Sequence, residues 1–331
     1  MSSERVAVVV SAHRMYATLE GCLLGFQAIL PRLEDLIFVD NGSTEYLGGL
    51  LGARFPGIGV IRLEQNKMFC GGYNAGIQFA MDRDYEFVLI ANADTEVINP
   101  QFLNELVQTA RRWPKAAFLG PLVYLRSRQV AQNTCLPFPG ILRQAAIWLP
   151  WHLVPGLFSH LPAHDAKVDF LNGVCVFCRV SALRSFGLMD ETYGGYLEDA
   201  DWSWRAKARG WNSLFTPVPS LIHHEETVGY EHYSLKSFLL KRNTVLWYLK
   251  AGRKTSALIY AKASLGLARL RMFSTRDQAK KRKHDYFLCR LSQAYHGLLA
   301  GQEISEWFGP PLSPWDSLNR GYYDPWGIFD S

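Results

Sequence analysis

The first half of the chain alternates short apolar runs with longer amphipathic segments. The apolar runs predict strands at residues 6–10, 36–40 and 58–63, and a fourth strand that begins at Phe87. The segments between them predict helices at residues 16–30, 72–81 and 100–112. Strands that alternate with helices favour a mostly parallel, twisted sheet flanked by helices, so the predicted fold class is α/β.

Polar side chains follow three of these strands where each apolar run ends. They are Ser11, His13 and Arg14 after the first strand, Asp40 after the second, and Asn92 and Asp94 after the fourth. Parallel strands end at one edge of a sheet, where open α/β sheets bind ligands. Asp94 can offer hard oxygen to a Mg²⁺ or Mn²⁺ that holds a diphosphate. The alternative is a helix N-cap or a turn residue before the helix at 100–112.

A loop with two adjacent glycines separates the third and fourth strands. Asn66 precedes Gly71 and Gly72, and Asn74 follows them on the predicted helix. Glycines before a helix let a ligand approach the backbone and meet free N–H groups, which suits a phosphate. The loop matches neither the P-loop nor the dinucleotide motif, so a purely structural loop is the alternative.

The second half is less regular. Five prolines with interleaved aromatic residues predict irregular structure at 113–166. The segment fits either a lid or an acceptor-facing loop, and the sequence does not decide between them. A strand at 168–178 and a short helix at 181–186 follow. Glu198, Asp199 and Asp201 then open a helix that ends before Gly210.

These three carboxylates suit the positive end of the helix dipole. Because adjacent carboxylates repel one another, the alternative is that one of them serves in proton transfer. His223 and His224 end a later strand, as structural residues or as metal ligands.

Composition narrows the class of protein. The 331 residues are 48% hydrophobic, which excludes a disordered or fibrous protein. The start of the chain lacks the apolar segment of a signal peptide, and no run is long enough to cross a bilayer, so we expect a cytoplasmic protein. Cys175 and Cys178 lie in an apolar run without a second CxxC, and we expect buried free thiols on opposite faces of a strand.

Positive charge is concentrated near the C-terminus. Between Lys236 and Arg290 the basic residues are opposed only by Asp277 and Asp285, although the whole chain has a net charge of +5. Helices predicted at 255–272 and 276–299 interleave these charges with leucines, which suits the inner face of an anionic membrane. A helical cap or homodimer contact is the alternative. Aromatic residues are too sparse there for nucleic acid.

Taken in order, these motifs resemble the family 2 glycosyltransferases, inverting enzymes of the GT-A fold, and within them the rhamnosyltransferase-like branch. The motifs are Val39-Asp-Asn-Gly-Ser-Thr44, Asn66 with residues 71–76, Ala91-Asn-Ala-Asp94, Phe186-Gly-Leu-Met-Asp-Glu191 with Glu198-Asp199-Ala-Asp201, Gly210-Trp211 and His223. The resemblance spans roughly residues 6–250. It implies a catalytic domain at 1–250 and a C-terminal helical extension at 251–331.

The resemblance also implies roles for single residues. Asp40 matches the residue that contacts the base or ribose of the nucleotide, and the loop from Asn66 to Asn74 flanks the nucleotide sugar. Asp94 matches the carboxylate that holds a divalent metal, Mn²⁺ or Mg²⁺, with His223 as second ligand and His224 as the alternative. Asp199 matches the general base.

On the acceptor side, the resemblance gives Glu198 and Asp201 a shaping role. After the first strand, His13 and Arg14 replace the aromatic or polar pair that is usual in the family. The implied partners are a nucleotide-diphosphate sugar donor and a glycan or lipid-linked acceptor, with rhamnose as a candidate sugar.

Two other function classes fit some of the motifs. Sugar-phosphate nucleotidyltransferases share the sheet and the metal-diphosphate site, but usually carry a glycine-rich loop after the first strand, and residues 11–16 contain no glycine. A non-catalytic carbohydrate-binding protein on the same fold is the other alternative, which the joint presence of Asp94, Asp199 and His223 disfavours.

Overall fold

A computed structural model describes residues 5–13, 18–43, 45–126, 130–141, 161–224 and 235–302. Arg14, a predicted site residue, lies outside these ranges, as does the segment at 142–160. The strands are β1 (Val6–Ala12), β2 (Leu36–Asn41), β3 (Gly59–Leu63), β4 (Phe87–Asn92), β5 (Thr95–Val97), β6 (Ala116–Leu125), β7 (Val130–Ala131), β8 (Cys135–Leu136), β9 (Ala166–Val168), β10 (Phe170–Leu171), β11 (Cys175–Arg179) and β12 (Asn212–His223).

The helices follow the predicted alternation. They are α1 (Leu19–Ile29), α2 (Leu47–Arg54), α3 (Met68–Met81), α4 (Phe102–Arg112), α6 (Val180–Phe186), α7 (Glu198–Ala208), α8 (Leu235–Lys250), α9 (Lys254–Ser274) and α10 (Gln278–Leu299), with short 3₁₀ turns η1 (Leu33–Asp35) and η4 (Glu191–Tyr193). The sequence pattern did not predict α2.

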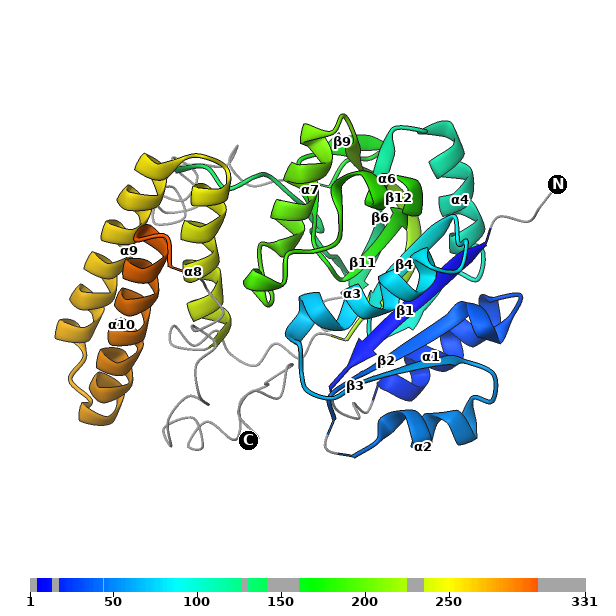
Figure 1. Ribbon diagram of the computed structural model, residues 1–331, viewed down its shortest axis with the longest axis horizontal. Coiled ribbons are helices and arrows are strands. Elements are labelled where there is room, and N and C mark those ends of the chain that lie inside the picture. The colour runs from blue at the N-terminus through cyan, green and yellow to red at the C-terminus, as the bar shows by residue number, and fades with distance from the viewer. Residues whose placement is uncertain are drawn as a thin grey trace.

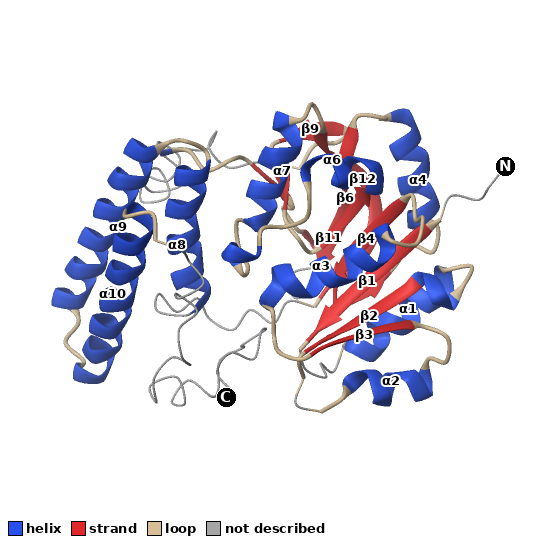
Figure 2. Ribbon diagram, viewed as in Figure 1, coloured by secondary structure: helices blue, strands red, loops and turns tan. Residues whose placement is uncertain are grey.

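The main sheet is mixed, with the order β3-β2-β1-β4-β11-β6-β12-β5 (Figure 2). Strands β3, β2, β1 and β4 run parallel, as predicted, and β6 is parallel to β12. Strand β11 lies antiparallel between β4 and β6 and joins the two parallel groups.

Each face of the sheet carries its own hydrophobic core. Val8 and Val10 of β1 pack with α1, α2 and α4, whereas Ala7 and Val9 pack with α3, α6 and α7 on the other face. This period of two is what a strand buried on both faces requires. Cys175 and Cys178 are buried free thiols that belong to opposite cores, which confirms that prediction.

Two predictions about the second half are wrong. The strand expected at 168–178 is broken, because Asn172-Gly173 turns the chain, so that β10 pairs with β8 and β11 joins the main sheet. The segment expected to be irregular contains β6, a long strand. This strand contains Pro121, and the β6–β12 pairing shifts register on either side of Pro219, so both prolines lie where the ladder is interrupted.

The helical extension forms a bundle beside the sheet. Helices α8, α9 and α10 pack against one another at one end of the molecule (Figure 1). Helix α8 ends at the predicted domain boundary of residue 250 and also contacts η4, so it touches both parts of the chain. None of the helices within the described ranges is long and apolar enough to cross a membrane.

Candidate active site

The predicted site residues of β1, β2 and β4 lie along one edge of the sheet. Ser11 is level with Asn92 on β4, and the neighbouring Ala12 is level with Asp40 on β2. All three strands run parallel, so their carboxyl ends meet there, as the sequence predicted.

Asp40 is fully buried and its carboxylate already has protein partners. It accepts hydrogen bonds from the backbone N–H groups of Ser43 (3.1 Å) and Leu47 (3.1 Å), and forms an ion pair with Arg62 at 3.1 Å. In this structure the side chain therefore fixes the turn between β2 and α2, and Arg62 is the partner that lies closer to the surface.

The ends of β1 and β2 are tied together by side chains. The ring Nδ1 of His13 lies 2.9 Å from the carbonyl oxygen of Asn41, so this nitrogen carries the proton. Asn41 in turn holds the start of α3, because its amide bonds to the carbonyl of Met68 at 2.8 Å and to the N–H of Lys67 at 2.9 Å. Asn41 belongs to the Val39–Thr44 motif, but the sequence analysis gave it no role of its own.

The start of α3 leaves one polar group without a protein partner. Asn66 accepts the N–H of Met68 at 2.7 Å, but its amide Nδ2 is buried and has no hydrogen-bond partner. Met68 has a left-handed backbone, with φ of 57°. The N–H groups of Cys70 and Gly71 already bond to Gly194 (3.0 Å) and Lys67 (3.1 Å). Asn66 Nδ2 is thus the donor at this helix start that is available to a ligand.

The adjacent glycines serve close packing. A Cβ at Gly72 would lie 2.5 Å from Ser11 Oγ, and one at Gly71 would lie 2.4 Å from Lys67 Cβ. Asn74 is buried and joins α3 to the chain before η4, since its amide donates to Met189 O (2.8 Å) and accepts from Met189 N (3.1 Å).

Asp94 and His223 face each other at the carboxyl edge of the sheet. His223 Nε2 lies 3.3 Å from Asp94 Oδ1, and both side chains are largely shielded from solvent. The other ring nitrogen, Nδ1, lies 3.1 Å from Gln132 Oε1, and Asn92 Nδ2 lies 3.4 Å from Nε2. Because an amide oxygen only accepts, Nδ1 donates a proton to Gln132, and Nε2 is the ring nitrogen that faces Asp94.

His224 points to different partners. Its Nε2 donates to Glu96 at 3.0 Å, and its Nδ1 accepts from Arg126 at 2.9 Å. Of the two candidate histidines, His223 is therefore the one whose ring lies against Asp94.

This pair fits a divalent cation chemically. Two acceptors that face each other, with the far ring nitrogen held by an amide oxygen, form the arrangement typical of a metal-bound histidine. Among the described residues no group of three or more histidine, cysteine or acidic side chains could hold a metal. Asp94 and His223 would therefore supply two ligands, and further positions would be open to a diphosphate.

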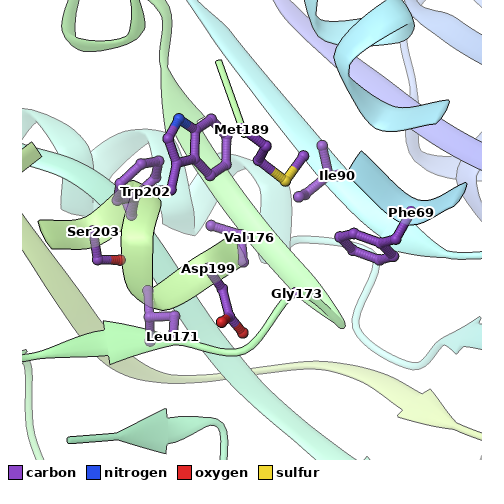
Figure 3. Close-up of a pocket in the computed structure, with 10 residues that line it drawn as sticks. Phe69, Ile90, Leu171, Gly173, Val176, Met189, Asp199, Trp202 and Ser203 are labelled. Carbon is purple, nitrogen blue, oxygen red and sulfur yellow. The ribbon is translucent and has the colours of Figure 1, made fainter. Parts of the chain in front are cut away.

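Asp199 opens into a small, largely apolar pocket beside the sheet. Phe69 of α3, Ile90 of β4, Gly173 and Met189 line it, together with residues of α7, and Figure 3 shows the Asp199 carboxylate in this setting. Burial raises the pKa of Asp199 from 3.8 to about 7, although backbone N–H groups of Ala200 and Gly173 oppose the shift. A carboxylate whose pKa lies near neutrality suits a general base.

The two neighbouring carboxylates have other surroundings. Glu198 is buried, its Oε2 has no hydrogen-bond partner, and burial together with the Asp199 charge raises its pKa well above the usual value. Asp201 forms a buried ion pair with Arg205 at 2.7 Å. Arg205 also donates to the carbonyls of Phe186 and Leu188, so Asp201 stabilises the segment before η4.

Helix α8 holds the turn that leads into α7. Asn243 donates to the carbonyls of Tyr193 (3.0 Å), Gly195 (2.7 Å) and Tyr196 (2.7 Å). Arg242 donates to Tyr193 O at 2.8 Å, and its burial lowers its pKa to about 10. The sequence analysis counted Arg242 among the basic residues of the tail, but its side chain is only 1% exposed.

Several residues that shape the site were not predicted. They are Asn41, Arg62, Gln132, Arg205 and Asn243. Arg205 lies four positions after Asp201 on a helix, a spacing that the sequence does reveal. Gln132 and Asn243 are distant in sequence from the groups they contact, so no local pattern points to them.

Comparisons with known proteins agree with this fold. The model of Glycosyl transferase family 2 matches residues 7–152. The chain is 26% identical over 260 residues to an N-acetylglucosaminyl-diphospho-decaprenol L-rhamnosyltransferase of Mycobacterium tuberculosis, over 69% of this chain and 82% of the relative. It is also 26% identical over 195 residues to the low-salt glycan biosynthesis hexosyltransferase Agl10 of Haloferax volcanii, over 58% of this chain and 59% of the relative.

Solved structures show the same fold. S. aureus TarS 1–349 in complex with UDP-GlcNAc has a TM-score of 0.52 at 14% identity, over 97% of this chain and 93% of that one. GalNAc-T7 with UDP, GalNAc and Mn²⁺ has a TM-score of 0.53 at 13% identity, over 91% of this chain and 57% of that one.

The mixed, curled sheet and its flanking helices have the GT-A fold of these solved structures. Residues 7–152 match the model of Glycosyl transferase family 2, and a rhamnosyltransferase is among the chain's relatives, which confirms the resemblance seen in its motifs. The chain is therefore an enzyme that transfers a sugar, and this replaces the nucleotidyltransferase and non-catalytic alternatives.

Proposed function

We propose that the enzyme moves a sugar, with rhamnose as the leading candidate, from a nucleotide-diphosphate donor to a hydroxyl group of a glycan or lipid-linked acceptor. The observation that carries the proposal is the placement of Asp94 against His223 at the carboxyl edge of the sheet. The decaprenol-linked substrate in the name of the mycobacterial relative supports a lipid-linked acceptor.

Asp94 and His223 would hold a Mn²⁺ or Mg²⁺ on the donor diphosphate. When bound, such an ion neutralises charge on the leaving group. Asn66 Nδ2, a buried donor without a protein partner, is available to an oxygen of the donor. Gln132 keeps the proton of His223 on Nδ1, so Nε2 stays free for the ion.

Asp199 would take the proton from the acceptor hydroxyl. Its raised pKa makes it a stronger base than an exposed carboxylate, and the apolar pocket around it excludes water. Glu198 is buried, with a pKa raised well above its usual value, and Asp201 is paired with Arg205, so Asp199 is the carboxylate best placed for this role. One base without a second nucleophile favours a single displacement with inversion at the anomeric carbon.

Nucleotide release from UDP-, dTDP- and GDP-sugars, with Mn²⁺ or Mg²⁺, tests the proposal. We expect metal-dependent hydrolysis of one donor, reduced about 100-fold or more by Asp94→Ala. Asp199→Asn should preserve donor affinity in calorimetry while reducing transfer to an acceptor by about the same factor.

A matched histidine pair tests the metal ligand. His223→Ala should abolish the Mn²⁺ dependence of nucleotide binding in calorimetry, whereas His224→Ala should leave it in place, because His224 is paired with Glu96 and Arg126. Equal losses in both variants would contradict the assignment of His223. Failure of the wild type to bind any donor would contradict the proposed function itself.

A further inference from the structure

Helix α9 has an unusual distribution of side chains. The side that packs into the bundle carries small residues, with Ala257, Ala261 and Ser264 nearly fully buried. Ser264 is hydrogen-bonded to Tyr295 of α10 at 2.9 Å. Large apolar side chains project outwards instead. A helix of a soluble bundle normally buries its large apolar residues and exposes polar ones, so the order is reversed here.

The outward side chains form one stripe, the outer face of α9. It consists of Leu258 (44% exposed), Ile259 (52%), Leu270 (65%) and Phe273 (74%), with Lys262 and Arg269 exposed between them. The spacing of 258, 262, 269 and 273 places these residues on one side of the helix. Figure 1 shows α9 at the outer end of the molecule, away from the sheet.

The charge of this face has one sign. Helix α9 contains no aspartate or glutamate in its 21 residues. Exposed Arg276, Lys281 and Arg282 follow at the turn into α10 and its first residues. Apolar anchors among basic residues fit the boundary between headgroups and acyl chains of an anionic bilayer, where each Lys or Arg near the surface is attracted to the lipid charge.

A second copy of the chain fits this face less well. A two-fold dimer presents the same patch to itself, so Lys262 and Arg269 would meet like charges with no acidic residue of α9 to offset them. We propose that the outer face of α9 docks the enzyme on an anionic lipid surface. The inference rests on the proposed function in one respect, since it names what holds the enzyme beside a lipid-linked acceptor. The observations that support it are the exposed side chains and charges of α9.

Vesicle co-sedimentation of the full chain tests the proposal. The vesicles are phosphatidylcholine alone or an equal mixture of phosphatidylcholine and phosphatidylglycerol. We expect binding to the mixture, and a loss of about tenfold or more in affinity for Leu270→Glu/Phe273→Glu and for Lys262→Glu/Arg269→Glu. The matched control is Leu24→Glu on α1, a leucine that is 50% exposed on the other part of the molecule and should bind as the wild type does.

The variants also separate this inference from the proposed function. Donor hydrolysis in solution should be unchanged in all of them, because none of the substituted residues touches the active site. The proposal would be overturned if the wild type bound neither kind of vesicle, or if it bound phosphatidylcholine vesicles as well as it binds the mixed vesicles. A concentration-dependent dimer that Leu270→Glu/Phe273→Glu dissociates, or retention on nucleic acid that Lys262→Glu/Arg269→Glu abolishes, would also overturn it.

Discussion

Glu198, Asp199 and Asp201 lie within four positions of one helix, and the fold gives each a different environment. Asp201 is paired with Arg205, and burial raises the pKa of Glu198 well above its usual value. Asp199 faces the pocket with a pKa of about 7. The sequence predicted that one of the three would be kept for proton transfer, but their different surroundings come from contacts with other segments.

The environment of Asp199 predicts a pH dependence of the transfer rate. Because the base must be ionised and burial raises its pKa to about 7, kcat should fall about tenfold per pH unit below that value and level off above it. The profile of kcat against pH, with saturating donor and acceptor, checks this. A rate that stays constant down to pH 5 would contradict the role of Asp199.

The pH dependence of the free energy of unfolding gives a second test of the raised pKa of Asp199. The folded pKa lies above the unfolded value, so the folded chain binds more protons between pH 4 and pH 7 and loses stability as pH rises through that window. Asp199→Asn removes this loss. At pH 8 its free energy of unfolding, measured with urea, should exceed that of the wild type by about 1–3 kcal/mol. The difference should disappear towards pH 4.

At the scale of elements, the parallel strands and their helices followed from hydrophobic periodicity, and the departures have local causes. Gly120-Pro121 lies inside β6 and is not typical of a strand. Asn172-Gly173 separates β10 from β11, although the sequence around it looks like one apolar run. The site was predictable as far as its residues end strands or open helices. The rest of it, such as Gln132 beside His223, depends on contacts between segments about 90 residues apart, which local periodicity does not encode.

Helix α3 illustrates how a site motif can serve packing. A Cβ at Gly76 would lie 2.3 Å from Val9 Cγ1, a rigid β-branched group on β1. Gly76→Ala should therefore push α3 away from the sheet and destabilise the protein by about 1–3 kcal/mol in urea unfolding.

Gly21→Ala is the control for this prediction. Gly21 lies on α1 with nothing within 4 Å of an added Cβ, so the substitution should stabilise the helix by about 0.5–1 kcal/mol. If Gly76→Ala were as stable as the wild type, the glycine would not be there for close packing.

At the scale of the whole molecule, α8 connects the helical bundle to the catalytic part. Trp247 of α8 packs against Trp204 of α7, with ring centroids 5.6 Å apart, and against Phe138 at 5.9 Å. Arg242 and Asn243 of the same helix bond to the backbone of the turn before α7. Tyr196 and Leu197 in that turn have left-handed backbones, with φ of 65° and 68°. Such residues need surrounding contacts to stay in place.

Asn243 should therefore act on both stability and catalysis. Asn243→Ala leaves the carbonyl oxygens of Gly195 and Tyr196 without this donor, whereas Tyr193 O keeps its bond to Arg242, and the loss should cost about 2 kcal/mol or more in urea unfolding. The turn at Tyr196 and Leu197 leads directly into α7, so its release should lower kcat. KM for the donor should stay near the wild-type value, because the proposed donor site lies at the sheet edge.

Asn104→Ala, on the exposed side of α4, is the control, with an expected change within about 0.5 kcal/mol and full activity. A destabilised Asn243→Ala that kept its kcat at a temperature where it remains folded would show that α8 supports the fold without positioning Asp199.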